Sequence, residues 1–206
     1  MPVDLHAKIK EEMPFTDYDF PPEERSLLDE SSNNSGLSVE TAAYYRSLQW
    51  QRASDVFKSS KIAENVSPDD IAQGKLGDCY FLSVLSVLAT DPNFIKSLFV
   101  NPEINKAGIY AINFYINGEK TQIIVDDAIP CDMSLGKSGY PAFATSKTYG
   151  DLWVILLEKA WAKLHGGYCK IRSGQAATAF AALTNKPSLE IEHAGVEREE
   201  EVWRKL

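Results

Sequence analysis

The sequence predicts an α+β fold in which helices dominate and a small antiparallel sheet is added. Three patterns support this prediction. Apolar residues cover nearly every face of segment 82–89, which indicates a buried helix with Cys79 in its first turn. Residues 151–164 repeat apolar side chains at helical spacing and predict a longer, amphipathic helix. Between them, Asn117-Gly118 separates two β-branched and aromatic segments, so a hairpin of Ile109–Ile116 with Thr121–Val125 is expected.

The remaining elements follow from turn formers and shorter apolar patterns. Residues 1–40 are expected to form an extended arm and, over 29–38, a flexible polar loop, and residues 41–206 the packed domain. Within that domain the expected elements are, in order, a short helix over 93–100, a long glycine-containing loop over 131–150, an Ala-rich helix over 175–183, an edge strand over 188–191 and a helix from about 196 onward. The apolar stripe of helix 151–164 is expected to pack against the helix that contains Cys79.

Composition excludes several classes of protein. The net charge is −8, and no cluster of Lys and Arg suits a phosphate backbone, so nucleic acid is not an expected partner. No segment approaches the ~20 apolar residues of a transmembrane helix, and the N-terminus lacks the apolar core of a signal peptide. Three widely spaced cysteines fit a reducing compartment better than a disulfide framework, which predicts a cytoplasmic location.

The candidate reactive residue is Cys79, at the junction of a glycine-containing loop and the predicted helix. The loop reads Gln73-Gly74-Lys75-Leu76-Gly77-Asp78. Unpaired N–H groups and the dipole at a helix N-terminus favour the thiolate, which is the nucleophilic form of cysteine. The Gln73 amide could point at the same reacting centre. The alternative is an ordinary small residue buried at a helix start, but the flanking glycines and Gln73 favour a reactive site.

This loop, followed by Tyr80-Phe81, resembles the active-site loop of the calpain family, a branch of the papain-like cysteine proteases. Residues 152–168 resemble the family's long helix, and smaller matches lie at Phe20-Pro21-Pro22, Trp50-Gln51-Arg52, Val125-Asp126-Asp127 with Pro130, Phe143 with Ser146, and Leu183-Thr184. The resemblance implies a papain-like fold, of which this chain contains the N-terminal, Cys-bearing helical lobe. It also implies protein or peptide substrates, with Cys79 as nucleophile and Gln73 as a hydrogen-bond donor to the oxyanion.

Segment 62–70 admits two interpretations. By local chemistry, Ser67-Pro68-Asp69-Asp70 is good helix-capping sequence, and this reading is favoured over a calcium loop of carboxylates and carbonyls. The calpain resemblance favours calcium. It implies carboxylate ligands at Asp70 and Asp151, and backbone carbonyl ligands near Ala63 and Asn65. Position 151 carries Asp where the family usually has the longer Glu.

The catalytic partners of a cysteine protease are missing from this sequence. Papain-like enzymes place a histidine about 130 to 150 residues after the cysteine. His165 and His193 lie earlier than that and outside the family's histidine motif, and no orienting Asn motif follows. His165 is expected to lie at the C-terminus of the helix, where a cation is favourable. Cys131 is expected to be a bystander, and Asp126-Asp127 a turn with N–H acceptors rather than an acid–base pair.

The predicted function is therefore a calcium-dependent cysteine endopeptidase of which this chain is the Cys-bearing half, inactive alone. The chain is expected to be truncated before a second subdomain, which would be its partner and would supply His and Asn. The alternative is a non-catalytic, calpain-like binding or regulatory module. An unrelated thiol transferase would need a local histidine partner, and none is evident in the sequence.

Overall fold

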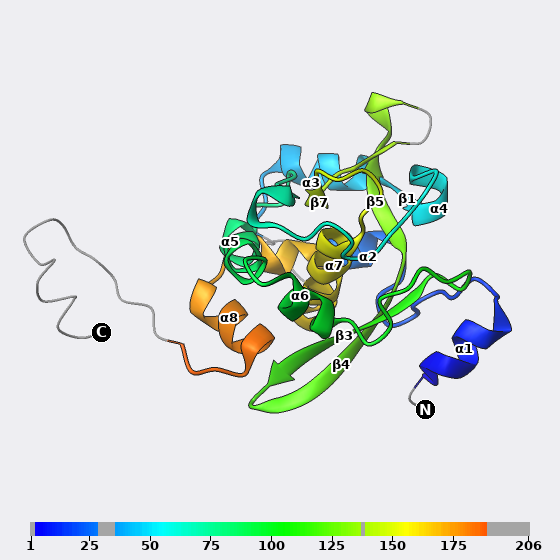
Figure 1. Cartoon of the computed structure of the whole chain (residues 1–206). Helices are drawn as coiled ribbons and strands as arrows, with labels where there is room; N and C mark the ends of the chain where they lie inside the picture. The colour runs from blue at the N-terminus through cyan, green and yellow to red at the C-terminus, as the bar shows by residue number, and fades with distance from the viewer. Residues whose placement is uncertain (1–2, 29–35, 137–138, 189–206) are drawn as a thin grey trace, which may run out of the picture.

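The computed structural model describes residues 3–28, 36–136 and 139–188, and its elements are arranged as in Figure 1. The helices are α1 (Leu5–Glu11), α2 (Glu24–Leu27), α3 (Val39–Ser47), α4 (Ala53–Val56), α5 (Cys79–Leu88), α6 (Pro92–Leu98), α7 (Trp153–His165) and α8 (Ala176–Thr184). The 3-10 turns are η1 (Pro68–Asp70), η2 (Met133–Leu135) and η3 (Tyr168–Ile171). The strands are β1 (Gln49–Arg52), β2 (Ile71–Ala72), β3 (Ile109–Ile116), β4 (Glu119–Asp126), β5 (Ala128–Asp132), β6 (Tyr140–Pro141) and β7 (Thr145–Ser146).

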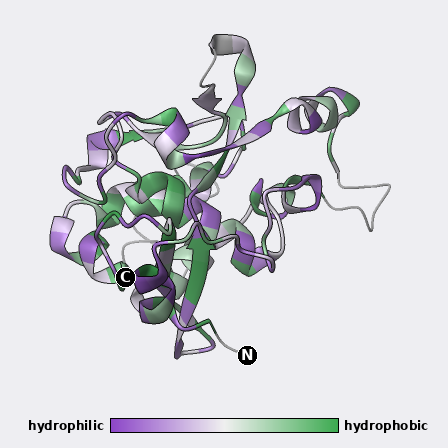
Figure 2. Ribbon diagram, turned by 90° about the vertical axis from the view of Figure 1, so that its right-hand side faces the viewer, coloured by the Kyte–Doolittle hydropathy of each residue, from purple (hydrophilic) through white to green (hydrophobic). Residues whose placement is uncertain are grey.

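Helix α7 lies at the centre of the fold. The combination of helices with small antiparallel sheets confirms the predicted α+β class. Residues 153–162 of α7 are all buried, including its two central charged residues. The ring of Trp161 stacks on Phe81 of α5 with centroids 5.0 Å apart, so the two predicted helices pack together. Figure 1 shows α5, α7 and α8 side by side, and Figure 2 shows hydrophobic segments gathered toward the middle of the ribbon. Glycine ends the helix, because Gly166 takes the left-handed conformation at its C-cap.

The predicted hairpin is the longest sheet element. Strands β3 and β4 pair antiparallel from Ile109 opposite Asp126 to Ile116 opposite Glu119. Asn117 and Gly118 both have positive φ, as a two-residue turn of type I′ requires. The first six residues of β3 are buried, and the hairpin packs on α8 and α7.

Two smaller sheets hold the segments around the predicted loop 131–150. Strands β1, β5 and β6 form an antiparallel sheet, and β2 pairs with β7. The sequence indicated a single long loop here, but the backbone of 140–146 forms short strands against β5 and β2. Pairing with distant strands, rather than local propensity, decides this structure.

The N-terminal segment differs in part from the predicted arm. Residues 13–23 are largely irregular, as expected, but α1 precedes them. Asp4 caps α1 by accepting a hydrogen bond from the Ala7 N–H, and Leu5 packs on the hairpin residues Ile109 and Ala111. The short helices α2 and α3 also begin before the predicted domain boundary. The flexible loop was predicted over 29–38, of which 29–35 lie outside the described residues.

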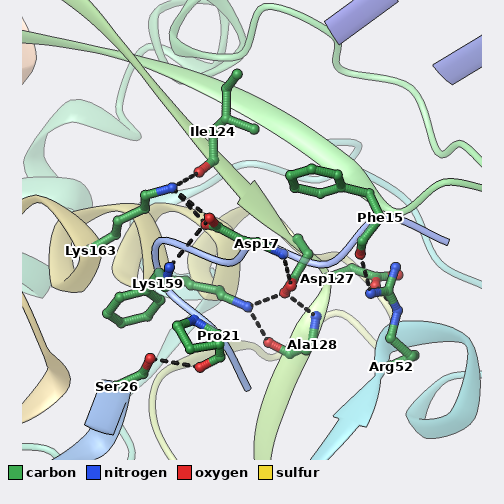
Figure 3. A network of polar contacts seen from close by, with 12 residues as sticks. Phe15, Asp17, Pro21, Ser26, Arg52, Ile124, Asp127, Ala128, Lys159 and Lys163 are labelled. Atoms are coloured by element: carbon green, nitrogen blue, oxygen red, sulfur yellow. Dashed lines mark hydrogen bonds and ion pairs between the residues drawn. The ribbon is translucent and has the colours of Figure 1, made fainter. Parts of the chain in front are cut away.

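Buried charges tie the irregular arm to the body of the molecule (Figure 3). Lys163 of α7 donates to the Asp17 carboxylate and to the Ile124 carbonyl. Asp126 accepts hydrogen bonds from the Asp17 N–H and from Lys159, the latter at 2.5 Å. Asp126 is therefore the structural N–H acceptor that the sequence predicted.

Arg52 completes this network. Its guanidinium donates to the Phe15 and Ala107 carbonyls and forms an ion pair with Asp127 at 2.5 Å. Asp127 is therefore also structural, through its charge pair.

Two predicted elements cannot be compared with the structure. The edge strand over 188–191 and the helix from about 196 lie outside the described residues, apart from Ser188. Within the described ranges, no helix combines the length and apolar character needed to cross a bilayer.

Candidate active site

Cys79 is the first residue of α5, and its side chain is exposed. Cys131 is fully buried in β5, and burial raises the pKa of its thiol to about 12. Cys169 is half-buried in η3. Because a thiol must be accessible to attack a substrate, Cys79 is the best placed of the three cysteines.

The loop before Cys79 lies against the segment 142–144. The Lys75 N–H donates to the Ala142 carbonyl at 3.0 Å. A Cβ added at Gly74 would overlap the backbone of Phe143, so position 74 must be glycine at this separation. Gly77 has φ +91°, which glycine adopts without strain, and it turns the chain into α5. These glycines therefore allow a close backbone contact and a tight turn immediately before the cysteine.

The first two N–H groups of α5 have no partner among the described residues. The N–H groups of Phe81 and Leu82 bond to the Asp78 carbonyl, whereas those of Cys79 and Tyr80 donate to no other described residue. Asp78 occupies the N-cap position, where an Asp side chain ordinarily accepts from the helix, but it makes no capping hydrogen bond. The unpaired N–H groups and the dipole of α5 thus remain free to stabilise negative charge near Cys79.

The Asp78 carboxyl turns into the core instead, where it meets the Glu158 carboxyl of α7. Asp78 is 0% exposed and Glu158 2% exposed. Both Glu158 oxygens accept from the Ala144 N–H, at 3.1 and 3.2 Å. Burial, followed by the neighbouring Asp78 charge, raises the pKa of Glu158 well above its ordinary value, and burial also raises the pKa of Asp78.

This contact between two acids is not predicted by the sequence pattern. Position 158 falls in an amphipathic helix whose polar residues are expected on the solvent side. The only signal was that Glu158-Lys159 lies in the middle of an otherwise apolar run.

Neither Gln73 nor either described histidine forms a hydrogen bond with Cys79. Gln73 is exposed, and its side chain makes no hydrogen bond to another described residue. His165 ends α7, where its Nδ1 lies 2.9 Å from the Trp161 carbonyl and its ring packs on Trp161. Neither His165 nor His6 bonds to Cys79, so the described residues provide no imidazole for it.

The structure brings the predicted calcium ligands into two hydrogen-bonded clusters. Asp151 is buried and accepts from the N–H groups of Ala63, Glu64 and Asn65 at 2.7 to 3.1 Å. Loop 63–65 therefore turns N–H groups toward this carboxylate, whereas a cation would need carbonyl oxygens.

The Asp70 carboxylate also accepts several hydrogen bonds. It accepts from the Ser146 hydroxyl, from the N–H and hydroxyl of Thr148, and from the Trp153 indole at 3.1 Å. The described residues include no group of three or more His, Cys, Asp or Glu side chains that could hold a metal ion. In this arrangement the four predicted ligands do not fit a calcium ion.

The helix-cap prediction for segment 67–70 is confirmed only in part. Pro68 begins η1, as helix-start chemistry favours, but the Ser67 side chain makes no capping hydrogen bond.

Comparisons with known proteins place the chain in a family. The model of the family described as "Calpain family cysteine protease" matches residues 15–206. The chain is 40% identical to calpain-type cysteine protease ADL1 of Oryza sativa subsp. japonica and to calpain-type cysteine protease DEK1 of Zea mays, in each case over 89% of this chain and 8% of the relative. It is 30% identical to calpain-5 of Caenorhabditis elegans over 84% of this chain and 25% of that protein. The chain thus spans a small part of the curated relatives it matches. The sequence-based resemblance is confirmed, and this chain belongs to the calpain family of cysteine proteases.

Proposed function

We propose that this chain is the Cys-bearing part of a calpain-type cysteine endopeptidase that hydrolyses peptide bonds in protein substrates. One observation carries the proposal: Cys79 is exposed at the start of α5, where two N–H groups lack a partner among the described residues. The sulfur would attack the carbonyl carbon of a peptide bond. The Cys79 N–H and the Gln73 amide would then donate to the oxyanion, each such donor contributing about 2.7 to 4 kcal/mol.

Turnover needs a general base that the described residues do not provide. An imidazole must take the thiol proton and later protonate the leaving amine, and a third group must orient it. The proposal therefore includes a second subdomain, carried by a longer chain, that supplies His and Asn. Chain 1–206 alone is expected to be inactive, because losing a triad member typically costs several orders of magnitude in rate.

Selective alkylation tests the role of Cys79. The chain is treated with iodoacetamide at pH 7, and labelling of each cysteine-containing peptide is followed by mass spectrometry. Cys79 is expected to react at least about tenfold faster than Cys169, and Cys131 slowest of the three, since a thiolate at a helix N-terminus is the better nucleophile. Cys79→Ser is the control that identifies the fast peptide. Equal rates at Cys79 and Cys169 would contradict the proposal.

Gln73 is tested in a longer chain that includes His and Asn. Gln73→Ala is expected to lower kcat about 10²- to 10³-fold with little change in KM, because the amide acts on charge that develops only in the transition state. Gln73→Glu, which keeps the size but removes the donor, should lower kcat to a similar extent. If both variants keep wild-type kcat, the proposed oxyanion role of Gln73 is wrong.

Calcium dependence is a separate part of the sequence-based prediction. Binding by Asp70, Asp151, Ala63 and Asn65 would require Asp151 to exchange its three N–H donors for the ion. If that exchange occurs, millimolar calcium should raise the thermal midpoint by mass action, and Asp151→Asn should abolish the rise. No shift relative to EDTA would contradict the calcium prediction and leave the cysteine protease proposal intact.

The cytoplasmic location also belongs to the proposal. Its support is that all three cysteines are free, as in a reducing compartment. Cell fractionation with an antibody against the chain would test it, and recovery in an oxidising compartment would contradict it.

A further inference from the structure

The loop that precedes Cys79 is held at three successive backbone positions of the segment 142–144. Lys75 bonds to Ala142, and Gly74 lies against the backbone of Phe143. The third connection is indirect: Asp78 meets Glu158, and Glu158 accepts from the Ala144 N–H. The first two contacts involve only main chain. The third depends on two acids from different elements, the N-cap of α5 and the middle of α7.

This pair of acids has no cation. Neither Asp78 oxygen accepts from a nitrogen or hydroxyl donor in the described part of the chain, and the only described donor to Glu158 is the Ala144 N–H. The titratable groups that interact with the pair are the phenols of Tyr45, Tyr80 and Tyr168, from α3, α5 and η3. Arg172 acts on the Tyr45 phenol and not on either acid. Two carboxylates cannot both remain charged in such a site, because like charges in contact are strongly destabilised when buried.

We propose that Asp78 and Glu158 share one proton and act together as positioning residues for Cys79. The shared proton bonds the two carboxyl groups and keeps Asp78 from capping α5. Consequently the N–H groups of Cys79 and Tyr80 stay unpaired, and the buried pair carries one negative charge instead of two. This inference rests on the proposed function, because positioning matters to catalysis only if Cys79 is the nucleophile.

The pair also makes the site sensitive to pH. The folded state holds the shared proton more tightly than the unfolded chain does. The pair therefore contributes stability at pH values below the ordinary carboxyl range, and this stability is lost as pH rises through the raised pKa of the folded pair. Removal of the proton would leave two negative charges in one buried site, so Asp78 would turn away from Glu158 and accept from the unpaired N–H groups of α5. Those N–H groups would then no longer be available to Cys79, and its reactions would slow.

Isosteric variants test this inference. Asp78→Asn, Glu158→Gln and the double variant each keep the shape and allow an amide to donate in place of the shared proton. Glu119→Gln, at an exposed carboxylate of the hairpin, is the matched control. For each protein, the thermal midpoint and the ratio of Cys79 to Cys169 alkylation rates are measured from pH 6 to pH 9.

In the wild type and in Glu119→Gln, both the midpoint and the ratio should fall with rising pH, the ratio about tenfold once the pair has lost its proton. In the double variant both the fall in the ratio and the fall in the midpoint should be smaller than in the wild type. A purely structural contact would leave the ratio equally pH-dependent in the wild type and in the isosteric double variant. That result would overturn the inference.

An infrared measurement on the wild type makes the test independent of the variants. A protonated carboxyl band should persist at neutral pH, and its absence would also overturn the inference. Failure of the proposed function looks different: Cys79 would then react no faster than Cys169 at any pH, while the thermal midpoints and the infrared band would still report the shared proton.

Discussion

The N-terminal arm and the loop before Cys79 are both irregular segments tied to α7, but by opposite means. Buried and half-buried cations hold the arm: Lys163 binds Asp17, Lys159 binds Asp126, and Arg52 binds Asp127 (Figure 3). The loop is held by main-chain contacts and by two acids without a cation. Adjacent residues of α7 serve the two regions, since Glu158 faces the loop and Lys159 faces the arm network.

This difference predicts how each region responds to pH. Contacts between a cation and a carboxylate persist at neutral and alkaline pH, so the arm should remain docked there. A proton shared by two acids is lost as pH rises, so the loop should loosen first. The contacts that anchor the outer segment are therefore separate from those that hold the loop before Cys79.

The largest expected effect comes from removing the cation at the centre of the arm network. Lys159→Met leaves Asp126 buried without its charged partner, and the free energy of unfolding should fall by about 3 to 5 kcal/mol. Urea denaturation measures this loss. Lys120→Met, at an exposed hairpin position, is the control and should change stability by less than about 0.5 kcal/mol. Equal effects of the two substitutions would show that charge pairing does not hold the arm.

The corresponding change on the loop side is Gly74→Ala. Its Cβ would overlap the Phe143 backbone, so the free energy of unfolding should fall by about 1 to 3 kcal/mol and alkylation of Cys79 should slow. Gly36→Ala is the comparison, because its Cβ has open space and only its positive φ opposes the change. It should leave Cys79 alkylation unaltered. If Gly74→Ala also left the rate unaltered, the backbone contact would not position the cysteine.

A smaller effect is expected from the acid at the edge of the arm network. Burial raises the pKa of Asp127 to about 6, although Arg52 opposes the shift. Because the folded-state pKa is raised, this group contributes stability near pH 4 that is lost as pH rises past about 6. Asp127→Asn cannot titrate, so its free energy of unfolding should fall less than that of the wild type between pH 4 and pH 7. Urea denaturation measures the free energy of unfolding across this pH range, with Asp55→Asn at an exposed position as the control. Parallel pH curves for the wild type, Asp127→Asn and Asp55→Asn would contradict the prediction.

The smallest effect is expected at the exposed end of the arm. Lys106 and Glu12 form an ion pair at 2.6 Å, but both side chains are more than half exposed. Glu12→Gln should therefore cost less than about 1 kcal/mol in thermal unfolding, and the cost should vanish at high salt. A loss as large as that of Lys159→Met would remove the distinction between buried and exposed anchors.

Much of the fold could be predicted from local patterns. The Asn117-Gly118 turn, the central helix with Gly166 after it and the helix that starts at Cys79 all depend on interactions between near neighbours in the sequence. Such interactions leave a visible period or a characteristic turn pair. The short strands β6 and β7 left no such mark, because they pair with residues far away in the chain.

The sequence by itself determined the family of this protein, through a cysteine after a glycine-containing loop, at a helix start, in the order of blocks that marks calpains. Only the tertiary structure decided how the acids are used. Asp151 and Asp70 accept hydrogen bonds where cation binding was predicted, and Asp78 faces Glu158 instead of capping its own helix. The physical reason is that the state of a carboxyl group depends on burial and on partners brought from distant segments, and neither is encoded in local spacing.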